Sequence, residues 1–524
     1  MMKTKNALRL AALTTLVLVS GATQAAAPGI KSSGNSFELR AEENYISEPD
    51  GNSVYSWGYG CASTAGISFA PAMQNATCST MQIPGPTLIV TEGVPFTVTL
   101  TNALPVPAGN TSILFPGLRI VSTSGGAAGL LTREATHGSP VTYTLVADSA
   151  GTRSYYSGTQ GDLQIEMGMY GAIIVLPSAV PAACNGGLAA QNAAASTAHG
   201  EDDFRLSHAA YNHAATCYDR EYLFQFSEVD LRIHQQVQEQ LQTIATCNAV
   251  PIDSRPVCAT ALNVETESYH PSYYMINGRS MPDDMDGNYA PQYPHQPYNG
   301  NPHMHPGELV LLRVIGTGRE QHPFHEHGNH VRVLARDGNL LLSQTDPGKL
   351  AGPLLFTTTT TPGQAMDGIF YWSGKGLNWD VFGHGFDGDA SACVPDANGY
   401  YTSVPAADNY YEWCGDHKKA LESKPFGTVG NGGPMTLPDP NVLALGPWYG
   451  GSPYLGPEAT ARAVGSTPIP PSGTVANDPT AEAGFAFMWH SHNERELTTN
   501  NAFPGGMMMM MLVDPRAFVI NEAN

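Results

Sequence analysis

Short runs in which apolar and polar residues alternate recur along the chain, separated by turns rich in glycine and proline. Phe96, Val98 and Leu100 alternate with threonines, as a strand with one buried face requires. Helical periodicity is rare, and Leu231 to Thr246 is the stretch that favours a helical insert. The pattern therefore predicts an all-β protein built from β-sandwiches.

The pattern of turns and strand-like runs in the first part of the chain repeats in the second part. The stretch 91–98 has a counterpart at 305–312, and the stretch 155–177 has one at 489–515. Two copies of one sandwich are the simplest account of this self-similarity. We expect a first sandwich over residues 36–180, a linker or loop over 181–220, and a second sandwich over 221–518 that is interrupted by an insertion at about 375–480.

The first 25 residues are typical of a processing signal. Basic residues, among them Lys3 and Arg9, precede a short apolar run from Leu10 to Val19, and small residues follow. This run is too short to span a bilayer, and no later stretch is long and apolar enough to be a membrane helix. We therefore expect a signal peptide over 1–25, no membrane span, and a periplasmic or secreted protein.

Charge and cysteine content agree with export. The formal net charge of −21 argues against binding to nucleic acid or anionic membranes. The eight cysteines include no Cys-x-x-Cys pair, and an even count in an exported chain favours disulfides over thiolate metal sites. The connectivity cannot be deduced, but the local pairings are Cys61–Cys78, Cys184–Cys217, Cys247–Cys258 and Cys393–Cys414.

Two apolar runs that predict strands each contain a pair of histidines. Because side chains alternate along a strand, His325 and His327 point to one side, and so do His490 and His492. Four imidazoles that converge from two strands can bind copper, zinc, iron or nickel. We therefore predict these four histidines as metal ligands, with His322 nearby.

The spacing of these histidines resembles that of the multicopper oxidases, which are built from cupredoxin sandwiches. Residues 322–327 carry the complete His-Pro-x-His-x-His motif of that family. The resemblance covers most of the mature chain. The arrangement of two sandwiches, with the histidine-rich motifs in the second, is similar to that of the two-domain members. It implies two cupredoxin-like Greek-key β-sandwich domains with long insertions, and copper as the cofactor. It also implies a mononuclear copper at His322 and a copper cluster at His325, His327, His490 and His492.

Three of the four copper motifs of the family depart from its pattern here. Ser491 stands where the family has the copper thiolate, and Glu496 stands where it has another histidine of the mononuclear site. Without the thiolate we expect no strong blue colour. With four of the eight cluster imidazoles, we do not expect four-electron reduction of dioxygen. The other replaced positions are Leu114 and Pro116 in the first motif, and Tyr156 and Gly158 in the second.

Three functions follow as hypotheses. The first is an exported multicopper-oxidase-like protein that binds copper at a reduced, histidine-only site and acts on an unknown electron donor, small molecule or metal ion. The second is a non-catalytic copper-binding or structural cupredoxin protein. The third is a zinc-dependent hydrolase, which ranks lower because the spacing places no general base, so zinc is the less favoured metal. A homo-oligomer is compatible with all three, but it cannot restore the missing imidazoles, because every copy lacks them.

Other residues with metal-binding side chains are interpreted structurally. Met507 to Met511 predict a core strand, with a soft-ligand role for Cu(I) as the alternative. His303 and His305 precede a turn, so we expect them to be surface polar residues rather than an accessory copper site. Tyr155 and Tyr156 are expected to fill, by packing, the space that the lost histidines would have occupied.

Overall fold

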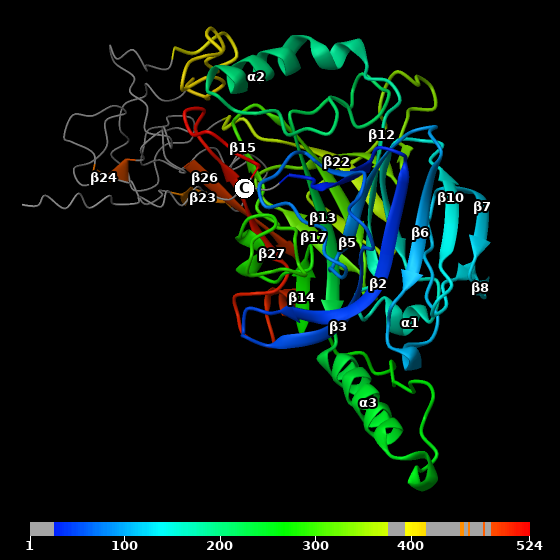
Figure 1. Ribbon diagram of the computed structural model, residues 1–524. Helices are drawn as coiled ribbons and strands as arrows, with labels where there is room; N and C mark the ends of the chain where they lie inside the picture. The colour runs from blue at the N-terminus through cyan, green and yellow to red at the C-terminus, as the bar shows by residue number, and fades with distance from the viewer. Residues whose placement is uncertain are drawn as a thin grey trace, which may run out of the picture.

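The structure, a computed structural model, describes residues 26–375, 394–415, 451–454, 460–461, 475–476 and 484–523. The expected signal peptide at 1–25 and most of the expected insertion at 375–480 lie outside these residues. Within the described part, the prediction of an all-β protein with two sandwiches is confirmed (Figure 1).

The first sandwich packs two sheets face to face. Ile173 and Val175 from one sheet and Phe96, Val98 and Leu100 from the other belong to one buried cluster, so the apolar side of the alternating run faces this core. One sheet has the order β11-β12-β5-β1-β4 and the other β3-β2-β6-β10-β7. The bounds are β1 Gly29–Ser32, β2 Ser36–Ser47, β3 Ser53–Cys61, β4 Ile67–Ala70, β5 Gly85–Thr91, β6 Phe96–Asn102, β7 Arg119–Gly125, β8 Ala127–Ala128, β9 Arg133–Glu134, β10 Val141–Val146, β11 Gly151–Tyr156 and β12 Tyr170–Leu176.

The second sandwich has its own core between two further sheets. Phe224 and Phe370 from one sheet pack against Phe324, Trp489 and Met509 from the other. The first of these sheets has the order β14-β13-β16-β22-β18-β19, and the second has the order β15-β27-β26-β17-β21. The bounds are β13 Arg220–Val229, β14 Tyr273–Ile276, β15 His303–Met304, β16 Leu309–Gly316, β17 His322–Glu326, β18 Val331–Arg336, β19 Asn339–Leu340, β20 Leu354–Leu355, β21 Thr357–Thr360, β22 Ala365–Tyr371, β23 Gly451–Tyr454, β24 Thr460–Ala461, β25 Val475–Ala476, β26 Gly484–Ser491 and β27 Met508–Val513.

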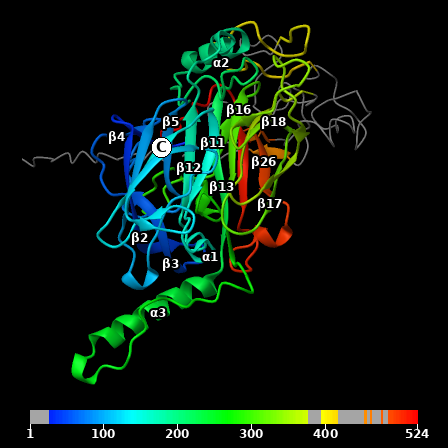
Figure 2. The ribbon, with the colours of Figure 1, turned by 90° about the vertical axis from the view of Figure 1, so that its right-hand side faces the viewer.

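The four sheets lie one behind another. Ile89 and Ile174 on the outer face of the β5–β12 sheet pack against Leu223, Ile315 and Ala365 of the β13–β16–β22 sheet. Figure 2 shows this order, with β2 and β3 on one side and β17 and β26 on the other. The sheet that contains β17 and β26 is therefore the outermost layer, and one of its faces points away from the first sandwich.

Helices lie in the connections between strands. The predicted insert after residue 230 is confirmed as α3 (Leu231–Ala249), whose first turn is capped by Asp230 and which projects from the body (Figure 1). The stretch 181–220, expected to be a loop or linker, instead contains α2 (Gly187–Ala198), since this segment is rich in alanine, the best helix former. The shorter helices are α1 Gly161–Gln164, η1 Val106–Ala108, η2 Ala182–Asn185, η3 Ile252–Ser254, η4 Asp283–Met285 and η5 Glu494–Leu497. Among the residues described, we find no helix with the length and apolarity to cross a membrane.

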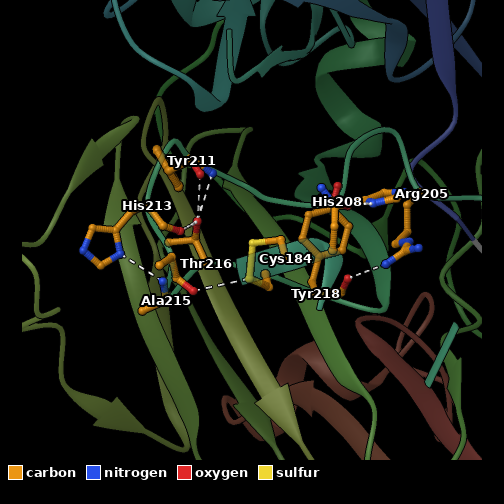
Figure 3. The surroundings of a disulfide bond; sticks show 11 residues. Cys184, Arg205, His208, Tyr211, His213, Ala215, Thr216 and Tyr218 are labelled. Carbon is orange, nitrogen blue, oxygen red and sulfur yellow. Dashed lines mark hydrogen bonds between the residues drawn. A yellow bond between two sulfur atoms is a disulfide. The ribbon is translucent and has the colours of Figure 1, made fainter. Parts of the chain in front are cut away.

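Three of the expected local disulfides are present: Cys61–Cys78, Cys184–Cys217 and Cys247–Cys258. The second of these links the segment that leads into α2 to the residues just before β13 (Figure 3). There the Thr216 hydroxyl donates to the Tyr211 carbonyl, and Arg205 donates to the Tyr218 carbonyl. The fourth expected pairing involves Cys393, which lies outside the described residues.

Candidate metal centre

The four predicted histidines come together on the outermost sheet. β17 and β26 are antiparallel neighbours, and His325 lies directly opposite His490. Phe324 and Trp489, their immediate neighbours in the chain, belong to the core of the second sandwich. Because side chains alternate along a strand, His325 and His490 point to the opposite face, away from that core.

The distances between the rings are those of a compact cluster. Ring centroids lie 4.8 Å apart for His325 and His327, 5.5 Å for His325 and His490, and 5.2 Å for His327 and His490. His492 lies beside them, with its centroid 4.8 Å from that of His325 and 5.4 Å from that of His490, and its side chain is about half exposed. The ligand atoms of His325, His327 and His490 all fall within 4.8 Å of one another.

The nitrogen geometry fits a shared ion. Nε2 of His490 is 3.2 Å from Nε2 of His327. Two imidazoles at metal–nitrogen distances of about 2.0–2.1 Å in a tetrahedral site have their nitrogens about 3.3 Å apart. Nδ1 of His490 donates a hydrogen bond to the Ser491 carbonyl, which leaves the lone pair on Nε2, the nitrogen that faces His327.

The electrostatics of the cluster favour the metal-binding form of the imidazole. Burial, together with the neighbouring imidazoles, lowers the pKa of His325 to about 4, and burial also lowers the pKa of His490. These rings are therefore neutral near pH 7, and neutral imidazole is the ligand that copper and zinc bind. The donor set has four nitrogens and no sulfur, which suits Cu(II) or Zn(II).

His322 is not part of this cluster, although it was expected nearby and, from the resemblance, as the ligand of a mononuclear copper. Its Nε2 donates to Glu228 at 2.9 Å and its Nδ1 donates to Glu496 at 2.8 Å, both in the interior. Burial opposes a charge here, but the hydrogen bonds to the two carboxylates outweigh it and raise the pKa of His322 to about 9. At neutral pH the ring is an imidazolium without a lone pair for a metal.

The three positions that match the mononuclear copper site of the resemblance are nevertheless assembled. The Ser491 hydroxyl donates to the same oxygen of Glu496 that accepts from His322. We call the buried group formed by Glu228, His322 and Glu496 the ion triad. Glu228 was missed by the sequence reasoning, because it lies on β13 in the opposite sheet and carries no motif.

Restoring the thiolate alone is therefore not expected to restore a blue copper site. In a Ser491→Cys variant loaded with Cu(II), we expect no intense visible charge-transfer band, because the imidazolium of His322 and the carboxylate of Glu496 still fill the positions of the other ligands. Visible absorption of the copper-loaded variant checks this, with the unmodified protein as the control. An intense blue band would contradict the ion triad as described.

The second His-x-His pair is buried, so the expectation that His303 and His305 are surface residues is wrong. Both are 0% exposed, because β15 pairs with β27 and is carried into the interior. Nδ1 of His303 lies 2.6 Å from the Asp514 carboxylate, and Nε2 of His305 lies 2.7 Å from that of Glu201.

The carboxylates around His305 are already paired with cations. Glu201, His305 and Glu308 have ligand atoms close enough for a metal ion. However, Arg220 donates to Glu308 at 2.6 Å and to Glu201 at 2.8 Å, and Arg516 donates to Glu308 at 3.0 Å. These guanidinium groups already supply positive charge to both carboxylates, so the group is an ion-pair network.

Tyr155 and Tyr156 lie away from the histidine cluster. Tyr155 donates to the Pro86 carbonyl in the core of the first sandwich. Tyr156 lines a cavity of about 200 Å³ with Gly316, Thr317 and Gly363, at the boundary of the two sandwiches. These placements differ from the expectation that both tyrosines fill space beside the histidine cluster, because that cluster points away from the first sandwich.

Comparisons with known proteins give one family match and several structural similarities. Residues 63–180 match the family model described as multicopper oxidase. The structure is similar to the multicopper oxidase mgLAC at 15% identity and a TM-score of 0.44, with 91% of this chain and 86% of that chain covered. It is similar to the blue copper oxidase from Nitrosomonas europaea at 14% identity and a TM-score of 0.43, with coverages of 91% and 85%. It is also similar to the copper nitrite reductase from Nitrosomonas europaea at 18% identity and a TM-score of 0.37, with coverages of 64% and 84%.

No curated protein sequence matches the chain. The family match lies wholly within the first half of the chain, whereas the histidine cluster lies in the second sandwich. Residues 63–180 are thus similar to the multicopper oxidases, and the described residues fold into two β-sandwiches.

Proposed function

We propose that this chain is an exported copper-binding protein that holds copper through His325, His327, His490 and His492. The observation that supports this most directly is the convergence of three imidazoles whose ligand atoms lie within 4.8 Å of one another. The rings of His325 and His490 are neutral near pH 7, and all four histidines lie on the two paired strands or directly after them. We call this group the histidine centre.

An oxidoreductase role is proposed only for electron donors that reach the histidine centre directly. A copper ion held there supplies one-electron redox chemistry. The position through which the family passes electrons is filled by Ser491 and the ion triad, none of which is a redox group. The half-exposed His492 leaves one side of the centre open to a small organic donor or a metal ion.

Non-catalytic copper binding is the second candidate, and one observation favours it. The ion triad and Ser491 stand in place of an electron-entry site, so no redox relay supports turnover with a large partner. Sequestration needs only the histidine centre. Turnover separates the two candidates. If the protein is an oxidoreductase, donors small enough to contact the histidine centre are oxidised, whereas a protein that only sequesters copper oxidises none.

Metal analysis of the purified mature protein tests the proposed function. We expect copper to co-purify or to bind on titration, and the double variant His325→Ala/His490→Ala to lose it, because each strand then contributes one imidazole fewer. His137→Ala, which removes an exposed histidine of the first sandwich, is the matched control and is expected to keep the copper. Unchanged copper in the double variant, or zinc as the metal of the native protein, contradicts the proposal.

Oxygen uptake then separates an enzyme from a binding protein. Copper-loaded protein is given a phenol or Cu(I) as the donor, and uptake is compared with that of the double variant. Uptake that the double variant lacks supports oxidoreductase chemistry at the histidine centre. Tight copper binding without uptake supports the non-catalytic role.

A further inference from the structure

Methionine side chains continue the outward face of the sheet beyond the histidine centre. β26 and β27 are antiparallel neighbours, and Met508 lies directly opposite His490, while Met510 lies directly opposite Met488. Residues that lie directly opposite one another in an antiparallel pair share a face, with Cβ atoms about 4.5–5.5 Å apart. Since His490 faces outward, Met508 faces outward beside it, and Met488 and Met510 follow one step along both strands.

Core packing does not account for these three side chains. The alternate methionines of the same run, Met507, Met509 and Met511, all belong to the core of the second sandwich. Met488 and Met510 are only half-buried and are not part of that core, and Met508 is buried on the face that carries His490. The prediction of a core strand is therefore right for one face of this run. The other face carries thioethers that lead up to an imidazole.

The chemistry of this face differs from that of the histidine centre. Thioether sulfur is soft and polarizable, and it favours Cu(I) over harder divalent ions. Four imidazoles favour Cu(II) or Zn(II) instead. The sheet thus presents two donor sets of different softness next to each other, and they share His490.

We propose that Met488, Met508 and Met510, together with His490, form a binding site for a soft monovalent metal ion, namely Cu(I). The site deepens the proposed function, on which it rests insofar as His490 also belongs to the histidine centre. It would let the protein hold copper in the reduced state on the same face that holds the oxidised ion. We call these four residues the thioether site.

Silver(I), a soft monovalent ion that needs no reductant, is the probe for the test. Titration is carried out in a His325→Ala/His327→Ala/His492→Ala background, which removes the histidine centre and keeps His490. We expect this protein to bind silver and to lose that binding when Met488, Met508 and Met510 are all replaced by leucine. The matched control is Met509→Leu in the same background, which changes the same strand on its core face and is expected to keep silver.

The outcomes distinguish this proposal from the proposed function. Silver binding that survives the triple leucine replacement, or that falls equally with Met509→Leu, overturns the thioether site. The triple leucine replacement in the otherwise unmodified chain is expected to keep Cu(II), because the histidine centre is intact. A native protein that binds no Cu(II), in a series where silver binding behaves as expected, would instead overturn the histidine centre alone.

X-ray absorption of the Cu(I)-loaded native protein gives a second measurement that does not depend on how the variants fold. We expect sulfur among the nearest neighbours of the ion, from the thioethers of this face. Cysteine thiolate does not account for it, because Cys61, Cys78, Cys184, Cys217, Cys247 and Cys258 are all held in disulfides. Nearest neighbours that are nitrogen and oxygen only would overturn the proposal.

Discussion

Replacing Arg220 with methionine is expected to lower the free energy of unfolding by about 3–5 kcal/mol, because it removes the cation shared by several buried carboxylates. Arg220 is buried and donates to Glu201 at 2.8 Å, to Glu308 at 2.6 Å and to Glu522 at 3.3 Å. Burial opposes ionisation of Glu308, but Arg220, followed by Arg516, outweighs it and holds the pKa of that carboxyl at about 2. Without Arg220, this charge loses its main partner.

Denaturant unfolding of the Arg220→Met variant measures the loss. Methionine keeps most of the side-chain volume, so the change reports charge and hydrogen bonding rather than a cavity. Arg119→Met is the matched control, because Arg119 pairs with Asp148 on the exposed surface and its removal is expected to have little effect. Equal losses in the two variants would contradict the importance of the buried network.

The ion triad is expected to make the protein less stable as the pH rises from about 6.5 to about 9. An unperturbed histidine titrates near pH 6.5, and in the folded state the pKa of His322 is raised to about 9. The native state therefore binds this proton more tightly than the unfolded state does. The stabilisation is fully present below pH 6.5, is lost as the pH passes through 9, and amounts to about 3 kcal/mol.

The measurement is the free energy of unfolding between pH 6 and pH 9.5 for the native protein and for Glu228→Gln/Glu496→Gln. Burial also raises the pKa values of Glu48, Glu166 and Glu522 to about 8, so stability falls with pH for these groups too. The difference between the two proteins therefore cancels the contributions of Glu48 and Glu522 and reports His322 together with Glu166, whose pKa the charge of Glu228 also raises. A difference that does not change over this pH range would contradict the charged state of the triad.

Local spacing was enough to predict that the two histidines of each His-x-His pair share a face, whereas their convergence depends on the pairing of β17 with β26. The His-x-His pairs lie in short apolar runs, and the period of two along a strand fixes which side chains share a face. The sandwiches followed from the same alternation, and α3 followed from its helical spacing. These predictions rest on neighbours in the sequence, where geometry is nearly independent of the rest of the fold.

The partners of those residues could not be predicted, because they come from strands that are distant in sequence. Nothing near His322 indicates that Glu228 lies across the sandwich from it. The burial of His303 and His305 depends on β15 joining β27, a pairing of segments about two hundred residues apart. Likewise, the placement of Tyr156 at the boundary of the sandwiches depends on the stacking order of the sheets, which no short pattern records.

The pairing of β17 with β26 also carries an entropic cost during folding. His325 and His490 meet only after the chain has closed a loop of more than one hundred and sixty residues, and closing such a loop carries an entropic cost before any contact repays it. The four-nitrogen set therefore exists only once β17 and β26 have paired. Uptake of a metal ion by all four rings would accordingly report that these two distant segments have come together, since either segment alone offers only one pair of imidazoles.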